Sequence, residues 1–266
     1  MMSAKPDIEI LSQCINDENG YYRLRVDSTV HYLIIPSGVF DEDTMCRPYL
    51  LIPRLPDFPD SPWTTMTLSR GEDGSLTSTI STDPLPEIQT AWHPQRVDVL
   101  SLKRTRRFRS GVHEVQYDGG VAIAKIACFN WDIARVERET WAYSVIAHDQ
   151  SQHPDESSIS PDFLGHLTEN SRIMGFLLQK VDGEPACIDD LVNCEALLRR
   201  LHSLGLIHGD VNRHNFLVDR ASGGITRLID FEHAEEFDKR SAEAELQSLP
   251  AELADETGRG STITMP

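Results

Sequence analysis

Alternating apolar and polar residues predict β-structure near the start of the chain. Residues 21–35 alternate in this way and favour a β-hairpin that turns near Asp27-Ser28. The proline-rich residues 48–62 are expected to be extended, because the proline ring fixes the backbone φ angle. Residues 70–86 are rich in Gly, Ser, Thr, Asp and Pro, which predicts a loop or linker. Residues 1–95 are therefore expected to form an N-terminal extension with no assigned chemistry.

After about residue 95, the pattern predicts a small antiparallel sheet around one helix. A tight turn at Asp118-Gly119-Gly120 joins two of the strands. Residues 132–148 have helical periodicity, and residues 149–160 read as a polar loop. The expected strands are residues 97–102, 112–117, 121–129, 163–167 and 173–178.

Residues 189–204 form the clearest helical pattern, with apolar side chains at i, i+3 and i+4 and Gly205 as the stop. Two short strands follow, residues 216–218 and 225–229. Residues 242–256 predict a last helix, interrupted at Pro250.

Charge and composition narrow the possible functions. The chain has 42 acidic and 25 basic side chains and a net charge of -17, which argues against nucleic acid or an anionic membrane as partner. The basic residues 103–109 are better explained as a solvated strand edge than as a nucleic-acid patch. The five cysteines show no metal-binding or disulfide spacing, and no apolar run suits a signal peptide or membrane span. We expect a soluble, cytoplasmic protein.

Candidate chemistry lies in the segment HGDVNRHN at residues 208–215 and in LIDFE at residues 228–232. Phosphoryl transfer needs one carboxylate to orient the hydroxyl, while an amide oxygen and a second carboxylate hold magnesium against the ATP phosphates. Asp210 and Asn215 come from one loop, and Asp230 follows the next strand. A surface turn with capping Asp and Asn residues is the simpler alternative.

These two motifs resemble the catalytic and metal-binding loops of the protein-kinase-like superfamily, in particular those of aminoglycoside and choline phosphotransferases. The resemblance implies that Asp210 is the catalytic base and that Asn215 and Asp230 are magnesium ligands. It also implies an α+β, kinase-like bilobal fold over residues 96–266. A small antiparallel sheet would form the N-lobe, about residues 96–180, and a short, mostly helical C-lobe would occupy about residues 181–266.

The strand VAIAK, residues 121–125, resembles the kinase motif whose lysine binds the α- and β-phosphates of ATP. Lys125 would be that lysine, with Glu139 as its partner and Glu137 as the second choice. No GxGxxG loop precedes it. Ser110-Gly111 is the candidate phosphate cover.

Other positions depart from the family pattern. Gly209 replaces the arginine of the kinase HRD motif, and His208 is expected to hold the loop by hydrogen bonds. Glu232 replaces the glycine of DFG and is either near the metal or an ordinary solvent-facing glutamate. Residues 231–266 are too few for the helices that normally complete a kinase C-lobe.

Residues 95–260 also resemble a group of short fungal kinase-like proteins, some labelled α-galactosidase. The shared segments are FLGHL, MGFLL, LHSLGLIHGD and ETGRG. A glycosidase would need two carboxylates across a sugar cleft on a larger scaffold, so that label is discounted.

The leading interpretation is an ATP- and Mg²⁺-dependent phosphotransferase that acts on a hydroxyl of a small molecule or a protein. The alternative is a pseudokinase that binds nucleotide or serves as a scaffold with little activity. An acidic adaptor without a nucleotide role is the third interpretation. The acceptor and the oligomeric state are left open.

Overall fold

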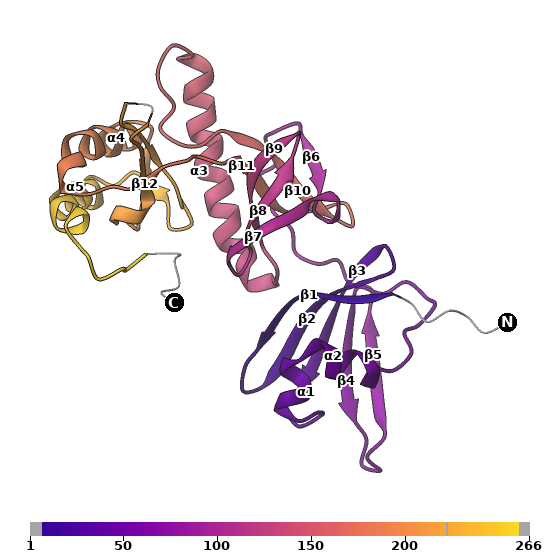
Figure 1. Cartoon of the computed structure of the whole chain (residues 1–266). Coiled ribbons are helices and arrows are strands. Elements are labelled where there is room, and N and C mark those ends of the chain that lie inside the picture. Colours follow the sequence, from indigo (N-terminus) through magenta and orange to yellow (C-terminus); the bar gives the residue numbers. More distant parts are fainter. Residues whose placement is uncertain (1–6, 222, 261–266) are drawn as a thin grey trace. The chain divides into compact units, whose positions relative to one another are not determined.

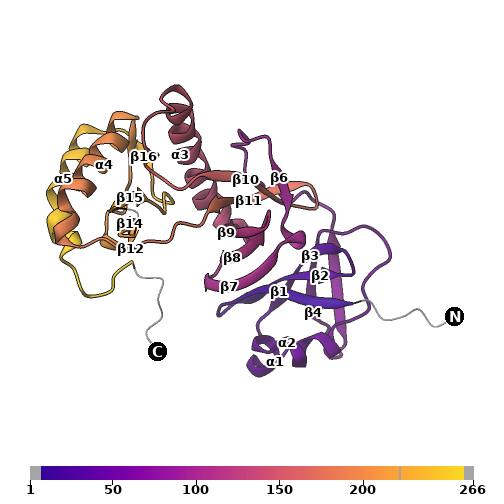
Figure 2. The same ribbon diagram turned by 45° about the horizontal axis from the view of Figure 1, so that its top comes forward.

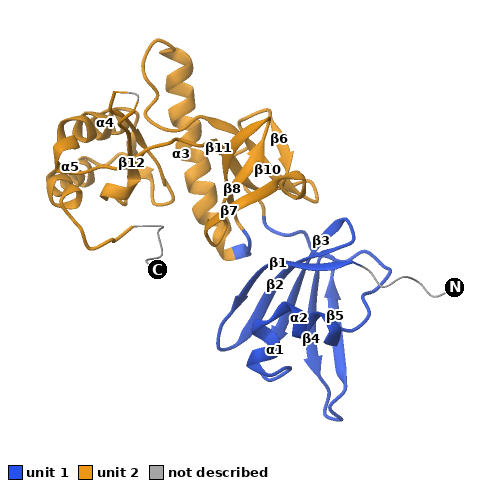
Figure 3. Cartoon of the chain, viewed as in Figure 1, with its two compact units in different colours: residues 1–86, 128–130 blue, residues 87–127, 131–266 orange. Residues whose placement is uncertain are grey.

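The computed structural model describes residues 7–221 and 223–260, and the chain divides into two compact units (Figures 1 and 3). Unit 1 comprises residues 1–86 with 128–130, and unit 2 comprises residues 87–127 with 131–266. The division lies at residue 86, whereas the sequence pattern placed it near residue 95. Ile88 accounts for part of this difference, because it is buried and its amide donates to the carbonyl of Ile173 in unit 2.

Unit 1 is a five-stranded sheet with two short helices. Its strand order is β1-β2-β3-β4-β5, and all neighbours are antiparallel except β3 and β4, which are parallel. The predicted hairpin is confirmed as β2 and β3, with Asp27 at a positive φ of 54° in the turn. The elements are β1 (Ile8–Ile15), β2 (Asn19–Val26), β3 (Thr29–Pro36), α1 (Glu42–Cys46), α2 (Pro48–Leu51), η1 (Ile52–Arg54), β4 (Thr65–Arg70) and β5 (Leu76–Ser81).

Two predictions for unit 1 were wrong. The proline-rich segment begins as helix α2, because Pro48 stands in the first turn, where a missing N–H costs nothing and the fixed φ suits a helix. The expected linker contains strand β5, whose alternating Ser and Thr residues are mostly exposed. Polar β-branched residues can form such an exposed strand, so composition alone misidentified it.

Unit 2 contains a six-stranded sheet in the order β6-β10-β11-β9-β8-β7 (Figure 2). It is not wholly antiparallel, since β6 runs parallel to β10. The basic segment is confirmed as an edge strand, β7. The expected strand 97–102 is only three residues long and continues as a 3-10 helix. The bounds are β6 (Arg96–Asp98), η2 (Val99–Ser101), β7 (Lys103–Arg109), β8 (Val112–Tyr117), β9 (Gly120–Ile126), η3 (Asn130–Asp132), α3 (Ile133–Gln152), β10 (Phe163–Glu169) and β11 (Arg172–Gln179).

The rest of unit 2 consists of two helices and two small sheets, of order β12-β14-β15 and β13-β16. Helix α5 is continuous, although an interruption at Pro250 was expected. Leu249 and Leu253 are buried on this helix, and their burial offsets the one hydrogen bond lost to proline. The bounds are β12 (Glu184–Pro185), η4 (Ile188–Asp190), α4 (Leu191–Ser203), β13 (Leu206–Ile207), η5 (Arg213–Asn215), β14 (Phe216–Asp219), β15 (Ile225–Leu228), β16 (Glu235–Glu236) and α5 (Lys239–Leu253).

One hydrophobic core connects the sheet, α3, α4 and α5 of unit 2. Tyr143 of α3 packs on Phe176 of β11 and on Phe231, which follows β15. This core anchors the segments on either side of residues 208–215 and 229–232. The architecture is a mixed α+β fold. Among the residues that the structure describes, no helix has the length and apolar character needed to cross a membrane.

Candidate active site

Lys125 of β9 joins two carboxylates that are remote from it in the chain. Its Nζ lies 2.7 and 2.8 Å from the two carboxylate oxygens of Glu139 on α3. The same Nζ lies 2.6 Å from Oδ1 of Asp230, which follows β15. The alternative partner, Glu137, instead accepts hydrogen bonds from the backbone amides of Gln89 and Thr90. The structure thus brings together Lys125, Glu139 and Asp230.

A glycine on the neighbouring strand sets the position of Lys125. A Cβ atom added to Gly175 of β11 would lie 2.1 Å from the Lys125 carbonyl oxygen, far inside van der Waals contact. The two strands can approach this closely only because residue 175 has no side chain. Asp230 adopts a positive φ of 67°, an uncommon conformation that Asp tolerates better than most residues.

The charges of this cluster depend on one another. Burial lowers the pKa of Lys125, but Asp230 and Glu139 outweigh it, so the pKa is raised and the ammonium stays charged. For Asp230, burial raises the pKa, but the nearby Lys125 and Arg109 lower it more, so the pKa lies below its usual range. Glu139 is the most deeply buried of the carboxylates, and burial raises its pKa despite the attraction of Lys125. Lys125 and Arg109 thus favour the ionised form of Asp230, whereas burial favours the neutral form of Glu139.

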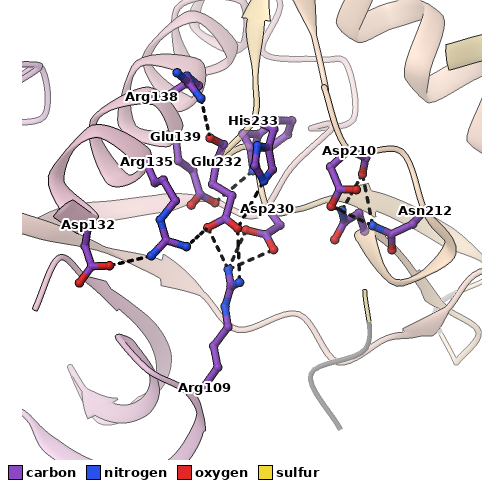
Figure 4. A network of polar contacts seen from close by, with 12 residues as sticks. Arg109, Asp132, Arg135, Arg138, Glu139, Asp210, Asn212, Asp230, Glu232 and His233 are labelled. Carbon is purple, nitrogen blue, oxygen red and sulfur yellow. Dashed lines mark hydrogen bonds and ion pairs between the residues drawn. The ribbon is translucent and has the colours of Figure 1, made fainter. Parts of the chain in front are cut away.

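Arg109, at the end of β7, is a second cation at Asp230 that the sequence analysis missed (Figure 4). Its Nη2 lies 3.1 and 3.2 Å from the two carboxylate oxygens of Asp230 and 3.2 Å from Oε2 of Glu232. The Glu232 side chain is 17% exposed and also lies 3.7 Å from Arg135. Glu232 is therefore an ion-paired residue beside Asp230 and not an ordinary solvent-facing glutamate.

The loop between β13 and β14 holds Asp210 in a separate hydrogen-bond network (Figure 4). Oδ2 of Asp210 accepts from the side-chain amides of Asn212, at 3.1 Å, and Asn215, at 3.2 Å. The Asn215 amide also donates to the Asp210 backbone carbonyl at 2.8 Å. These contacts fix the orientation of the carboxylate within its own loop.

The imidazole of His208 ties this loop to the segment that carries Asp230. Its Nε2 lies 3.0 Å from the Ile229 carbonyl, and its Nδ1 lies 3.4 Å from the Asp210 amide. A neutral ring with its proton on Nε2 satisfies both contacts. Burial lowers the pKa of His208 and favours this neutral form. His208 holds the loop by hydrogen bonds, as expected.

Glu245 of α5 stabilises this loop, and the sequence analysis did not identify it. Its carboxylate accepts from the Gly209 amide at 2.7 Å and faces Nε2 of His202 at 2.7 Å. Gly209 has a φ of +80°, and an added Cβ would lie 2.1 Å from the His233 carbonyl oxygen. A side chain at residue 209 would therefore collide with this carbonyl group, which accounts for the glycine. The acidic, helical pattern of α5 contained no signal that would have singled out one glutamate.

Two cavities border these groups. The larger, of about 370 Å³, is lined by apolar side chains and by charged and polar ones that include Lys125, Asn215 and Asp230. The smaller, of about 190 Å³, is lined by Ser110, Gly111, Lys125 and Glu139. Six of the seven predicted site residues therefore border a cavity, and the seventh, Asp210, is hydrogen-bonded to one of them. The apolar lining of the larger cavity includes Val112, Ile123, Leu178, Val181, Leu217 and Ile229.

The oxygen atoms at this site suit a hard cation whose remaining ligands come from a substrate. Within residues 7–221 and 223–260, no three His, Cys, Asp or Glu side chains are grouped as metal ligands. Asn215 and Asp230 offer oxygen atoms on one cavity. Magnesium commonly binds one or two protein oxygens, with phosphates and water as its other ligands, so these residues fit it.

A model of the lipopolysaccharide kinase (Kdo/WaaP) family matches residues 189–259. This region includes Asp210, Asn215 and Asp230, but not Lys125 or Glu139. No curated protein sequence matches the chain. The match covers 71 of the 266 residues, so this part of the chain is similar to part of a kinase family. It lends no support to the likeness to fungal proteins or to the α-galactosidase label.

Proposed function

We propose that this protein is an ATP- and Mg²⁺-dependent phosphotransferase that transfers the γ-phosphate to a hydroxyl group of a small molecule or protein. The convergence of Lys125, Glu139 and Asp230 from three separate elements carries this proposal. Burying three charged groups is costly. In a cleft, such an arrangement is typical of a functional site.

The two cavities support a division of roles along the nucleotide. The larger cavity is apolar around Ile123, Leu178 and Leu217, which suits the adenine ring. Lys125 borders both cavities and would bind the α- and β-phosphates. Glu139 would hold the Lys125 ammonium in place, since it contacts that group with both carboxylate oxygens.

Asn215 and Asp230 would hold Mg²⁺, which neutralises charge on the phosphates when it is bound. Asp210 would orient the acceptor hydroxyl and take its proton. A bond forms between the hydroxyl oxygen and the γ-phosphorus, and the bond from that phosphorus to the oxygen it shares with the β-phosphate breaks, releasing ADP. The HGD and DFE sequences resemble those of small-molecule phosphotransferases more than the HRD and DFG motifs of protein kinases, which favours a small acceptor.

A pseudokinase is the second candidate, and the contacts of Asp230 favour it. This carboxylate already faces Lys125 and Arg109, so Mg²⁺ must compete with two protein cations for it. If the competition fails, nucleotide would bind without efficient transfer. The two functions differ in turnover and not in ATP binding.

Thermal unfolding with ATP, in the presence and absence of Mg²⁺, tests the nucleotide site. ATP should raise the free energy of unfolding by RT ln(1 + [L]/Kd), and the melting temperature should rise with it. Mg²⁺ should increase this effect. Lys125→Met should remove most of the shift, while Lys103→Met, on the exposed edge strand, should not. A parent protein that ATP leaves unstabilised would contradict the proposal. Phosphate transfer to a panel of metabolites and peptides then separates the phosphotransferase from the pseudokinase.

A further inference from the structure

The turn between β7 and β8 is poorly equipped to bind phosphates through its backbone. It contains Ser110 and Gly111, and only the glycine has a positive φ, of 74°. The Gly111 carbonyl already accepts a hydrogen bond from the Ile126 amide, which ties the turn to β9. A glycine-rich loop binds phosphates with several backbone N–H groups. A nucleotide at this site therefore needs another source of positive charge.

Arg109 directly precedes this turn and reaches into the site. With Lys125, it is one of two cationic side chains that border both cavities. Its guanidinium contacts both oxygens of Asp230 and the carboxylate of Glu232. Its side chain remains 35% exposed, so it can leave these partners without disturbing a packed core.

The charge balance indicates what Arg109 is needed for. Arg109, Lys125 and Arg135 face three carboxylates, those of Glu139, Asp230 and Glu232. Each of these cations is therefore already paired with a carboxylate before a nucleotide binds. A triphosphate adds more negative charge, and Lys125 is already engaged by two carboxylates. The planar guanidinium matches phosphate oxygens as well as carboxylates.

We propose that Arg109 binds the nucleotide phosphates in place of a glycine-rich loop. Without nucleotide, its guanidinium rests on Asp230 and Glu232. When nucleotide binds, the guanidinium transfers to phosphate oxygens and leaves Asp230 open to Mg²⁺. This inference rests on the proposed function, because it assigns a residue to the same nucleotide site.

Nucleotide titrations of four proteins test this role: the parent, Arg109→Gln, Arg109→Lys and Arg107→Gln. Arg107 is the matched control, because it lies on the same strand and is exposed. Loss of one or two charge-assisted hydrogen bonds should weaken ATP binding by Arg109→Gln on the order of 10- to 100-fold. Arg109→Lys should lose less, and Arg107→Gln should bind ATP as the parent does. Adenosine, which has no phosphate, should not distinguish the variants.

The outcomes separate this inference from the proposed function. If the parent does not bind ATP, both fail. If the parent binds ATP and Arg109→Gln binds it equally well, Arg109 has no phosphate role, and the proposed function stands. Tighter ATP binding by Arg109→Gln would show that Arg109 only blocks the metal position. Should Arg109→Gln not fold, Arg109→Lys decides the matter, since unchanged ATP affinity in that variant would also overturn the inference.

Discussion

The cluster around Lys125 and the loop that carries Asp210 are built by different means. The cluster pairs full charges from β7, β9, α3 and the segment after β15. The loop pairs one carboxylate with amide groups two and five residues away. Tertiary packing assembles the first, and local hydrogen bonds assemble the second. The comparison teaches that a change in the cluster should affect stability and binding, whereas a change in the loop should affect transfer.

The largest expected effect is on transfer, and it separates the two regions most clearly. Asp210→Asn keeps the shape of the side chain but removes the charge that orients and deprotonates the hydroxyl. Phosphate transfer should fall by a factor on the order of 10² to 10⁴, with little change in ATP affinity. Steady-state transfer rates and ATP titrations measure both quantities.

Asp230→Asn provides the contrast, because it changes a proposed metal ligand in the cluster. Mg²⁺-dependent ATP binding should weaken along with the rate. Asp189→Asn, at an exposed position outside both regions, is the control. If Asp210→Asn and Asp230→Asn both behaved as an active parent does, these carboxylates would be structural.

The next effect is on stability and concerns the buried charges of the cluster. Lys125→Met leaves Glu139, whose side chain is 2% exposed, without its lysine partner. Breaking such a buried pair typically costs about 3–5 kcal/mol in the free energy of unfolding. The double variant Lys125→Met/Glu139→Gln should recover part of this loss, because the unpaired charge is gone. Urea unfolding of the parent, Lys125→Met, Glu139→Gln and the double variant would show it, and strictly additive costs would contradict the account.

A smaller effect is expected for Glu245, which holds the loop by hydrogen bonds. Glu245→Gln weakens charge-assisted hydrogen bonds to Gly209 and His202. The free energy of unfolding should fall by about 1.5–3 kcal/mol, and transfer should fall more than ATP affinity. Glu243→Gln, at an exposed position on the same helix, should change neither. Equal results for the Glu245→Gln and Glu243→Gln variants would show that Glu245 does not stabilise the loop.

The smallest effect is a pH dependence that arises at His208. Burial lowers the pKa of this imidazole in the folded protein, although Glu245, Asp230 and Asp210 oppose the change. The unfolded chain then binds a proton more readily, so stability should fall as the pH drops below about 6.5 toward the folded-state pKa. His208→Gln should flatten this part of the curve of unfolding free energy against pH.

Other histidines with lowered pKa values act in the same direction, so the difference between parent and variant is the measured quantity. His31, His93, His166 and His214 belong to this group. His148→Gln, at an exposed site, is the control and should leave the curve unchanged. A parallel curve for His208→Gln would show that His208 does not contribute.

Periodic segments of the chain were predictable because their patterns reflect a simple geometry. Strands β8, β10 and β11 and helices α3 and α4 occur close to where apolar spacing placed them. Helix α2, strand β5 and the unbroken α5 were not predicted. In these three segments, composition indicated an extended stretch, a loop and an interruption. The position of Pro48 in the first turn, pairing with a neighbouring strand and a buried helix face determined the structures instead. Composition is a weaker guide than periodicity because it ignores these contacts.

By itself, the sequence determined the order of the candidate site residues and placed Asp210 and Asn215 in one loop, because the two lie within six consecutive residues. It also identified Lys125 and Asp230 as belonging to one site. Only the tertiary structure decided between Glu139 and Glu137 as the partner of Lys125. It alone showed that Arg109 contacts Asp230 and that Glu245 supports the loop. These contacts join residues 14 to 121 positions apart in the chain. Such pairing depends on how strands and helices pack, which no local pattern of residues encodes.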